Sequence, residues 1–304
     1  MVFTLPALLS QLTLQNQRLM YGLLFKTASE TLLEIAADPR HLGGQIGFLA
    51  VLHTWGQTLQ HHPHLHCVVP GGGLSPDHTK WIACRQGFLL PVKVLSRRFR
   101  SKFLGALRQA FAARKLVCAG QLTQLAQPPQ YQKLLKELDQ REWVVYAKPP
   151  FGGPAQVLKY LARYTHRVAI SNHRLLSFAE NRVTFHYKDY AAGNASKTMT
   201  LEVQEFTRRF LLHVLPKGFV RIRHYGYLAN RDRQAKLELC RQRIAQSSAR
   251  AVSGSGAELS VPTPFEESFR CPVCREGRMK RIDVNTVPMV QLTEVSLVFW
   301  ADSS

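Results

Sequence analysis

The chain has 304 residues, of which 45% are hydrophobic, and this content excludes a largely disordered protein. Lys and Arg number 40 against 20 Asp and Glu, so the formal net charge is +20. No apolar run approaches the roughly 20 residues of a membrane span, and the six cysteines do not form a disulfide framework, so we expect a cytoplasmic protein.

The N-terminal part of the chain predicts a strand followed by helices. Residues 2–6, "VFTLP", are a short β-prone run closed by proline, and the apolar spacing from about 10 to 37 is helical. Residues 45–60 resume a helical pattern, which Pro63 is expected to end.

The next segment changes to a β pattern. Residues 64–70, "HLHCVVP", alternate and predict a strand, and the glycines at 71–73 predict a loop. A basic amphipathic helix is expected over 96–117, and residues 141–150 read as another strand.

The C-terminal part begins with a turn at 151–154, and Pro154 favours the start of a helix over 155–167. A further helix is expected at 203–216, and residues 247–260 predict a linker. Strands are expected at 168–171, 174–178, 182–190, 198–203 and 218–228, around turns at Asn172 and Asn181. These elements divide the chain into a main domain, 1–240, and a basic C-terminal extension, 241–304.

Positive charge is concentrated in two stretches. Residues 78–136 hold twelve Lys and Arg with no acidic residue, and residues 208–250 hold eleven with two acids, Asp232 and Glu238. Surfaces of this kind attract polyanions, and nucleic acid is the default partner. A generic basic surface remains an alternative, whereas the lack of a lipidation signal disfavours an anionic membrane.

Two histidines stand one residue apart on the strand expected at 64–70. Because side chains alternate faces along a strand, His64 and His66 project from one face, and Leu65 and Cys67 from the other. Two imidazoles on a rigid sheet can hold a divalent ion and leave positions open for phosphate oxygens and water. Ordinary surface or core histidines are the alternative.

The motif does not define a third metal ligand. Gln57, seven residues before His64, can supply an oxygen and is our candidate. His62, Glu30 or a residue far away in the chain can take that place instead, and a solvated Gln57 without a metal role is equally compatible with the sequence.

Two tyrosines stand four residues apart on the helix expected over 155–167. This spacing places the phenols of Tyr160 and Tyr164 on one face, beside a basic stripe formed by Lys159, Arg163 and Arg167. A tyrosine oxygen can act as a covalent nucleophile, but its free pKa of about 10 requires a polarising metal and nearby positive charge. From the spacing alone, a pair of packed aromatic rings is the simpler explanation.

Together these segments resemble the HUH-type rolling-circle transposases of bacterial insertion sequences, the two-tyrosine kind. "HPHLHCVVPGGGLS" is similar to the histidine motif of that family, and "YLARYTHRVAISNHRLL" to the segment with its catalytic tyrosines. "GFVRIRHYGYLANRDR" is similar to a third characteristic stretch. The resemblance runs from about residue 2 to 245, and the tyrosine segment is its most specific part.

The resemblance implies a DNA transposase that nicks and transfers single strands. His64 and His66 would bind Mg²⁺ or Mn²⁺, and Tyr160 and Tyr164 would attack DNA, leaving a 5′-phosphotyrosine and a free 3′-hydroxyl. Its partners would be single-stranded DNA at the element ends and target DNA, with no membrane. The phosphates would be bound by Lys159, Arg163, Arg167, Arg221 and Arg223.

The elements and the resemblance together predict an α+β fold: a central antiparallel sheet that carries the histidine strand, flanked by helices, with the basic C-terminal extension. Family members usually begin with a cysteine-rich zinc module, whereas this chain starts in its first expected strand. We therefore expect either that the module is missing or that the start lies downstream of the true one. Cys271 and Cys274 supply half of a zinc site, so zinc is a second candidate cofactor.

Two other functions use the same residues differently. In a histidine-triad nucleotide hydrolase or transferase, His62, His64 and His66 would alternate on one strand and a histidine would attack an α-phosphate without a metal; a charge of +20 fits such compact proteins poorly. A non-catalytic DNA-binding protein would explain the basic stretches but neither the histidine strand nor the tyrosine helix. The product distinguishes these functions: a covalent protein–DNA species, a released nucleotide, or neither.

Overall fold

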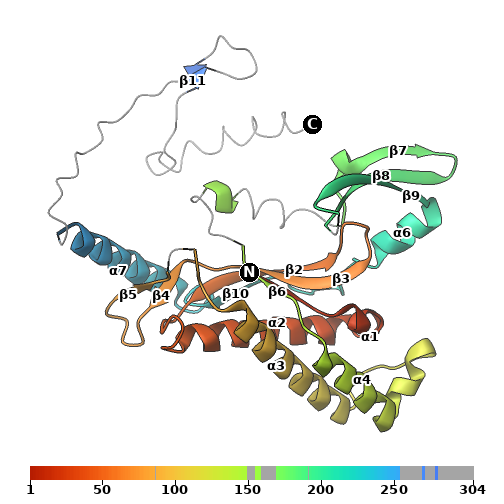
Figure 1. Cartoon of the computed structure of the whole chain (residues 1–304), viewed down its shortest axis with the longest axis horizontal. Coiled ribbons are helices and arrows are strands. Elements are labelled where there is room, and N and C mark those ends of the chain that lie inside the picture. The colour runs from red at the N-terminus through yellow and green to blue at the C-terminus, as the bar shows by residue number, and fades with distance from the viewer. Residues whose placement is uncertain are drawn as a thin grey trace. The chain divides into compact units, whose positions relative to one another are not determined.

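The computed structural model describes residues 1–85, 87–148, 155–158, 169–190, 192–253, 269–270 and 278–279. The chain divides into two compact units, Met1–Ala251 and Val252–Ser304. In the second unit, the short strands β11 (Phe269–Arg270) and β12 (Arg278–Met279) pair antiparallel. The first unit contains both larger sheets and the helices that pack on them (Figure 1).

The first unit is organised around a five-stranded antiparallel sheet with the strand order β10-β2-β3-β1-β6. Strands β2 and β3 form a hairpin at its centre, and the α+β class with an antiparallel sheet is confirmed. The five strands are β1 (Val2–Thr4), β2 (Gly47–Trp55), β3 (His61–Val68), β6 (Val145–Tyr146) and β10 (Ile222–Gly226).

The segment 45–60 is not the helix that its pattern predicted, because it contains strand β2. Nearly every residue of β2 is buried, since the strand lies between β10 and β3 in the middle of the sheet. A strand buried on both faces loses its two-residue alternation, and a short apolar run of this kind cannot be distinguished from a buried helix by periodicity.

Pro63 likewise belongs to β3 and does not end a helix. Its carbonyl accepts a hydrogen bond from the backbone N–H of Leu5 at 3.1 Å. The register of the β2–β3 pair shifts between His53 and Trp55, and Pro63 lies opposite this irregularity. Proline is tolerated in a strand at such a bulge, where its missing N–H leaves no ladder bond broken.

The glycine run at 71–73 is part strand, which corrects the predicted loop. Strand β4 (Gly72–Leu74) pairs with β5 (Trp81–Ala83), and Leu74 exchanges backbone hydrogen bonds with Gln45. A Cβ atom on Gly73 would lie 2.7 Å from the Gln45 carbonyl oxygen, so only glycine allows the two backbones to approach this closely.

Helices cover one face of the central sheet, where Figure 1 shows α2 running beneath the strands. The helix predicted from 10 to 37 is confirmed, although Asn16 breaks it into two. The helix predicted over 96–117 is confirmed with bounds four to five residues earlier. The helical elements are η1 (Ala7–Leu9), α1 (Ser10–Gln15), α2 (Gln17–Ala37), α3 (Val92–Ala112), η2 (Gly120–Ala126) and α4 (Pro128–Gln140).

The main hydrophobic core lies between this sheet and helices α2 and α3. Alternate strand residues point into it, among them Phe3 from β1, Leu52 from β2 and Leu65 from β3. They meet Phe25 of α2 and Phe99 of α3, and Phe3 and Phe99 contact edge to face at 5.2 Å. The residues between them on each strand therefore face the other side of the sheet.

A second, three-stranded antiparallel sheet has the order β7-β8-β9. Its strands are β7 (Leu175–Ala179), β8 (Arg182–Asp189) and β9 (Ala195–Glu202), and helix α6 (Val203–Leu211) packs on one face. The turn predicted at Asn181 is confirmed: Glu180 and Asn181 both have positive φ, as a two-residue hairpin turn requires.

The strand predicted at 168–171 is absent from its described residues, 169–171. Ala169 has a positive φ of 57°, and the backbone N–H of Arg174 bonds to the Ser171 carbonyl at 2.9 Å, which leads into the 3₁₀ helix η3 (Asn172–Arg174). A left-handed residue followed by a tight turn is incompatible with an extended ladder. The four described residues at 155–158 are helical, as predicted.

The last helix of the first unit, α7 (Arg233–Ser253), extends into the predicted linker. The part of that linker before Gly254 lacks Gly and Pro and contains the helix formers Ala and Arg, so local propensity permits the helix to continue. The predicted domain boundary near residue 240 falls inside α7 and stays a prediction. Among the described helices, none combines the length and apolar character that crossing a bilayer requires.

Candidate metal centre

Three histidines gather on the face of the central sheet opposite α2 and α3. His53 comes from β2, and His64 and His66 come from β3. One ring nitrogen of each lies within 4.8 Å of those of the other two. The described residues contain no second cluster of three such side chains. The predicted pairing of His64 with His66 on one face, opposite buried Leu65 and Cys67, is confirmed.

The register of the hairpin explains why the three rings meet. His53 lies directly opposite His64 across the β2–β3 ladder, and His66 is the next residue of β3 on the same face. The ring centroids are 4.4 Å apart for His53 and His66, 4.9 Å for His64 and His66, and 5.4 Å for His53 and His64. Because β2 and β3 each pair with a strand on both edges, the backbone that carries these side chains is fixed on both sides.

Neighbouring groups orient two of the rings. Nδ1 of His64 lies 2.7 Å from the carbonyl oxygen of His62. A carbonyl can only accept, so Nδ1 carries the proton and Nε2 keeps its lone pair for a ligand. The indole of Trp55 stacks on His53 at 4.6 Å with an interplanar angle of 15°. These contacts fix the rings before any ion binds.

Burial keeps His64 and His66 uncharged at neutral pH. It lowers the pKa of His64 to about 4, with a smaller contribution from His62, against the opposing hydrogen bond to the His62 carbonyl. Burial also lowers the pKa of His66 below its usual value, helped by His64 and His53. A metal ion binds the neutral imidazole, so these residues already hold the protonation state that an ion requires.

The other two histidines of the motif have different surroundings. His61 lies between the hydroxyl oxygen of Tyr21, 2.9 Å from Nε2, and that of Ser10, 2.9 Å from Nδ1. Burial lowers its pKa to about 4. His61 thus links β3 to helices α1 and α2. His62 is exposed, and its ring centroid lies 5.3 Å from that of His64.

His53 was missed by sequence reasoning, and Gln57 lies in the turn that follows it. The Gln57 side chain donates from Nε2 to the Tyr190 hydroxyl at 3.1 Å and accepts at Oε1 from the Lys188 backbone N–H at 3.3 Å. The structure therefore offers a third imidazole beside His64 and His66, and the role of Gln57 as a ligand stays a prediction.

The predicted phosphate ligands Arg221 and Arg223 adjoin the helix-covered side of the sheet. The Arg223 guanidinium lies over the rings of Phe25 and Phe219, at 4.1 and 5.2 Å from their centroids. The Arg221 carbonyl accepts from the Leu52 backbone N–H, and burial lowers the pKa of its guanidinium. Their binding to DNA stays a prediction.

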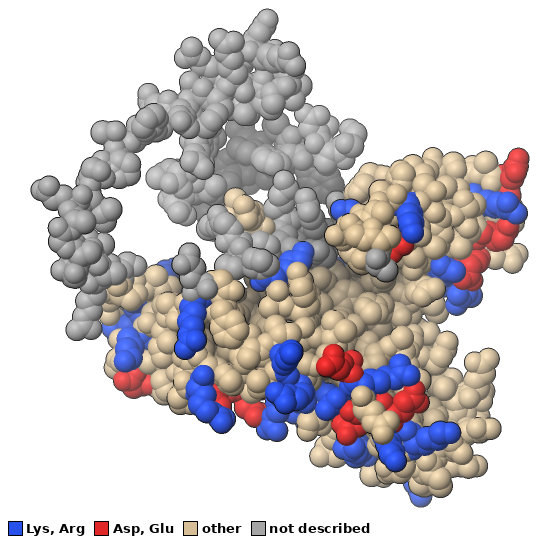
Figure 2. All heavy atoms as spheres, in the orientation of Figure 1, with Lys and Arg blue, Asp and Glu red and all other residues tan. Residues whose placement is uncertain are grey.

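Part of the basic stretch at 78–136 is neutralised within the fold. Glu34 of α2 pairs with Arg98 at 2.6 Å and with Lys102 at 2.9 Å, both on α3, and Arg100 pairs with Asp139 of α4 at 3.4 Å. Figure 2 shows the mixture of blue and red along these helices. Some of the basic residues that were expected to bind a polyanion therefore form ion pairs between helices instead.

Other predicted site residues lie outside the described residues. They are the tyrosines Tyr160 and Tyr164, the basic residues Lys159, Arg163 and Arg167, and the cysteines Cys271 and Cys274. Their roles stay predictions.

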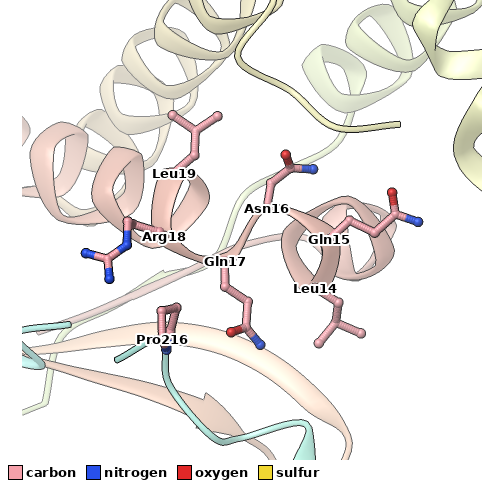
Figure 3. A pocket seen from close by; sticks show the side chains of 7 residues that line it. All are labelled: Leu14, Gln15, Asn16, Gln17, Arg18, Leu19 and Pro216. Carbon is pink, nitrogen blue, oxygen red and sulfur yellow. The ribbon is translucent and has the colours of Figure 1, made fainter. Parts of the chain in front are cut away.

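One hollow lies where α1 joins α2 (Figure 3). It has a volume of about 370 Å³, and Figure 3 shows Gln17 pointing toward Pro216 and Asn16 away from it. Its lining residues are Leu14, Gln15, Asn16, Gln17, Arg18, Leu19 and Pro216. Asn16 bonds the backbone of Val117, and Arg18 donates to the Lys217 carbonyl at 2.6 Å. The polar side chains around this hollow therefore connect segments of the fold, and none of its lining residues is a nucleophile or an acid–base group.

Another hollow adjoins the histidine cluster. It has a volume of about 460 Å³ and is lined by His53 and Trp55 of β2, by the turn residue Gln57, by the segment 169–174 and by residues of the small sheet. The cluster therefore borders a cavity that is large enough for an organic ligand, since such pockets commonly measure about 300–1,000 Å³.

Comparison with known proteins assigns the chain to a family. Residues 47–236 match the Y2_Tnp family model, described as "Putative transposase". This range contains His53, His64 and His66 and also both tyrosines, Tyr160 and Tyr164. No solved structure matches the chain significantly.

Two curated relatives are similar to most of the chain. "Putative transposase y4qJ" of Sinorhizobium fredii (strain NBRC 101917 / NGR234) is 54% identical over 288 residues, covering 93% of this chain and 72% of that protein. "Transposase for insertion sequence element IS801" of Pseudomonas savastanoi pv. phaseolicola is 28% identical over 241 residues, covering 76% of this chain and 54% of that protein.

Proposed function

This chain belongs to the Y2_Tnp transposase family, and from that premise we propose that it cuts and transfers single strands of DNA in a metal-dependent reaction. The observation that carries the proposal is the cluster of His53, His64 and His66 on the face of the central sheet opposite α2 and α3. A transposase acts on phosphodiesters, and a divalent ion bound at such a cluster would polarise the scissile phosphate.

The residues present fit a divalent ion. Three imidazoles supply three ligands and leave the remaining positions open for phosphate oxygens and water. Of the two ions expected from the sequence, a nitrogen donor set favours Mn²⁺ over Mg²⁺, because Mg²⁺ prefers oxygen ligands and retains its water. Titration of the metal-free protein with each ion separates the two.

The nucleophiles of this proposal are Tyr160 and Tyr164. Their phenol oxygen attacks the phosphorus, forms a 5′-phosphotyrosine and displaces the 3′ oxygen, which leaves as a hydroxyl after taking up a proton. Lys159, Arg163 and Arg167 stand beside the tyrosines in the sequence and balance the charge of the phosphate. The position of both tyrosines inside the family-matched range supports this assignment.

The partners that follow are single-stranded DNA at the element ends and a target DNA. Family membership favours this function over the histidine-triad nucleotide hydrolase and over a DNA-binding protein without catalysis. The chain covers 72% and 54% of the lengths of its two relatives. That this chain carries out a complete transposition reaction is therefore part of the same proposal.

A covalent-capture assay tests the proposal. The protein is mixed with Mn²⁺ or Mg²⁺ and with labelled single-stranded oligonucleotides from the sequence flanking the gene, and the products are separated under denaturing conditions. We expect a shifted protein–DNA band that requires the metal and disappears in the Tyr160→Phe/Tyr164→Phe double variant.

Two matched variants identify which part of the proposal is at fault if the result differs. Capture that persists in the double variant rejects the tyrosines as nucleophiles. Capture that is unchanged in His64→Ala rejects the metal centre. Tyr146→Phe is the control, because this exposed tyrosine on edge strand β6 belongs neither to the histidine cluster nor to the tyrosine segment.

A further inference from the structure

The cavity beside the histidine cluster has walls that are tied together from both sides. Arg174 donates to the backbone carbonyl of Gln57 at 2.5 Å and to that of His186 at 2.8 Å. Gln57 in turn bonds Tyr190 and the backbone of Lys188. The turn after β2 is thereby fastened to the end of β8, and both contribute residues to the cavity of about 460 Å³.

The lining combines aromatic rings with polar and cationic groups. Trp55, Tyr187 and Tyr190 contribute rings, and Lys188 and Ser196 contribute an ammonium and a hydroxyl. One face of Trp55 is already covered by His53, and Tyr187 is partly buried against the small core. Of these three rings, Tyr190, with 67% of its surface exposed, has the largest surface left for a ligand.

This combination suits a planar, hydrogen-bonding heterocycle that is attached to a phosphate. Aromatic side chains bind single-stranded nucleic acid by stacking on its bases, and a nearby cation tracks its backbone. A base paired within a duplex cannot enter a pocket of this kind, because its ring is already stacked and its edge is paired. The contact of His53 with both the cavity and the cluster places the pocket next to the metal centre.

We propose that this cavity, between the β2–β3 turn and strand β8, binds one unstacked base of single-stranded DNA next to the phosphate at the histidine cluster. The inference rests on the proposed function, since it names a subsite for the same substrate. Stacking on Tyr190 then positions the strand, and the cavity selects single strands over duplex.

Binding without cleavage tests the subsite. The probes are a fluorescently labelled dT octamer, an octamer of the same length with abasic sugars, and the dT octamer in a duplex. Anisotropy is measured in EDTA at one fixed salt concentration, so that neither metal nor nicking contributes. We expect Tyr190→Ala to bind the dT octamer about tenfold more weakly and the abasic octamer equally well, because only base stacking is lost.

Two further variants separate the ring from its surroundings. Tyr190→Phe keeps the ring and loses the hydroxyl that accepts from Gln57, so its affinity for the dT octamer should stay within about twofold of the parent. Phe178→Ala is the matched control, because Phe178 is 72% exposed on β7 of the same small sheet and does not line the cavity.

The outcomes distinguish this proposal from the proposed function. If Tyr190→Ala binds the dT octamer as tightly as Phe178→Ala does, or if the duplex binds as well as the single-stranded octamer, the subsite is rejected while covalent capture is unaffected. If capture fails but the base-dependent loss in Tyr190→Ala is present, the subsite stands and the nicking function is rejected. A protein that binds no octamer at all rejects both.

Discussion

The two antiparallel sheets of the first unit differ in how their strands come together. The central sheet joins strands from Val2 to Gly226, and its core includes residues of α2, α3 and α4. The small sheet is a meander within Leu175–Glu202, and its small core combines side chains of the sheet and of α6 with Leu59 and Ala169. Every residue of β7 is exposed.

This difference matches what each sheet contributes to the candidate site. The cluster of His53, His64 and His66 requires ring positions fixed within fractions of an ångström, and it stands on the two central strands of the larger sheet. The small sheet supplies the far wall of the cavity, where a wall that adjusts to its ligand is tolerable. Regions with few buried contacts open locally at a lower free-energy cost than the main core.

The largest expected effect comes from truncating one aromatic residue in each core. Phe3 and Phe185 are both fully buried and both contact a neighbouring ring edge to face. Each change to Ala should cost about 3–5 kcal/mol of local stability. We expect Phe3→Ala to unfold the whole unit, whereas Phe185→Ala should open only β7–β9 and α6, as hydrogen exchange read by mass spectrometry would show. Equal loss of protection in β2 and β3 in both variants would mean that the two sheets unfold together.

The next largest expected effect is on Mn²⁺ affinity, and it should differ between a buried histidine of the cluster and a buried histidine outside it. His53→Ala should weaken Mn²⁺ binding more than about 100-fold, since even indirect supports of a metal ligand are worth 10–100-fold. His213 is as buried as His53, but its Nε2 donates to the Leu59 carbonyl and its Nδ1 faces the Thr54 hydroxyl.

His213→Ala should therefore lower stability by about 1–3 kcal/mol while Mn²⁺ affinity changes little. Calorimetric titration of both variants with Mn²⁺ measures the difference. If the two variants lose affinity equally, the effect of His53 reflects general loosening of the sheet and not ligation.

Much of the central sheet could be predicted from the sequence because one of its faces is clearly patterned. The alternation around Leu65 and Cys67 placed His64 and His66 on the same face, and the apolar spacing of 10–37 predicted the helix that covers the other. Local turn chemistry was also sufficient at Asn181, where the backbone needs positive φ. Each of these signals lies within a short window of the chain.

His53 could not be found in the same way, because its place depends on two facts outside its window. The run around it is buried on both faces and reads equally well as a helix. Only with 47–55 taken as a strand, and with the turn length known, does the hairpin register bring His53 opposite His64. The tyrosine segment illustrates the opposite case: a sequence motif that stays a prediction because the described residues do not include it.

Acidification should lower the free energy of unfolding of the central sheet, by less per histidine over the measured pH range than the substitutions in the core do. Burial holds the pKa of His61 and His64 at about 4, below the unfolded value of about 6.5, so the unfolded chain takes up protons first as the pH falls. Their contribution to stability is complete above pH 6.5 and is lost progressively toward pH 4, at about 1.4 kcal/mol per pH unit and histidine. Denaturant unfolding at pH 7, 6 and 5 measures the slope, which His61→Gln should reduce. A slope that is unchanged by this variant would assign the pH dependence to other groups.

The smallest expected effects on stability come from removing exposed ion pairs. One such pair can be tested in the helices beside the central sheet and one in the small sheet. Glu34 joins α2 to α3 through Arg98 and Lys102, whereas Glu202 makes a single pair with Arg182 across β8 and β9. Surface pairs contribute about 0–1 kcal/mol each, and a carboxylate shared by two cations lies toward the upper end. Glu34→Gln should therefore cost about 1 kcal/mol and Glu202→Gln less than about 0.5 kcal/mol. Denaturant unfolding at low and high salt checks both values, because salt should remove most of the Glu34 effect if it is electrostatic. An effect of Glu34→Gln that persists at high salt would instead show that its side chain supports the packing of α2 against α3.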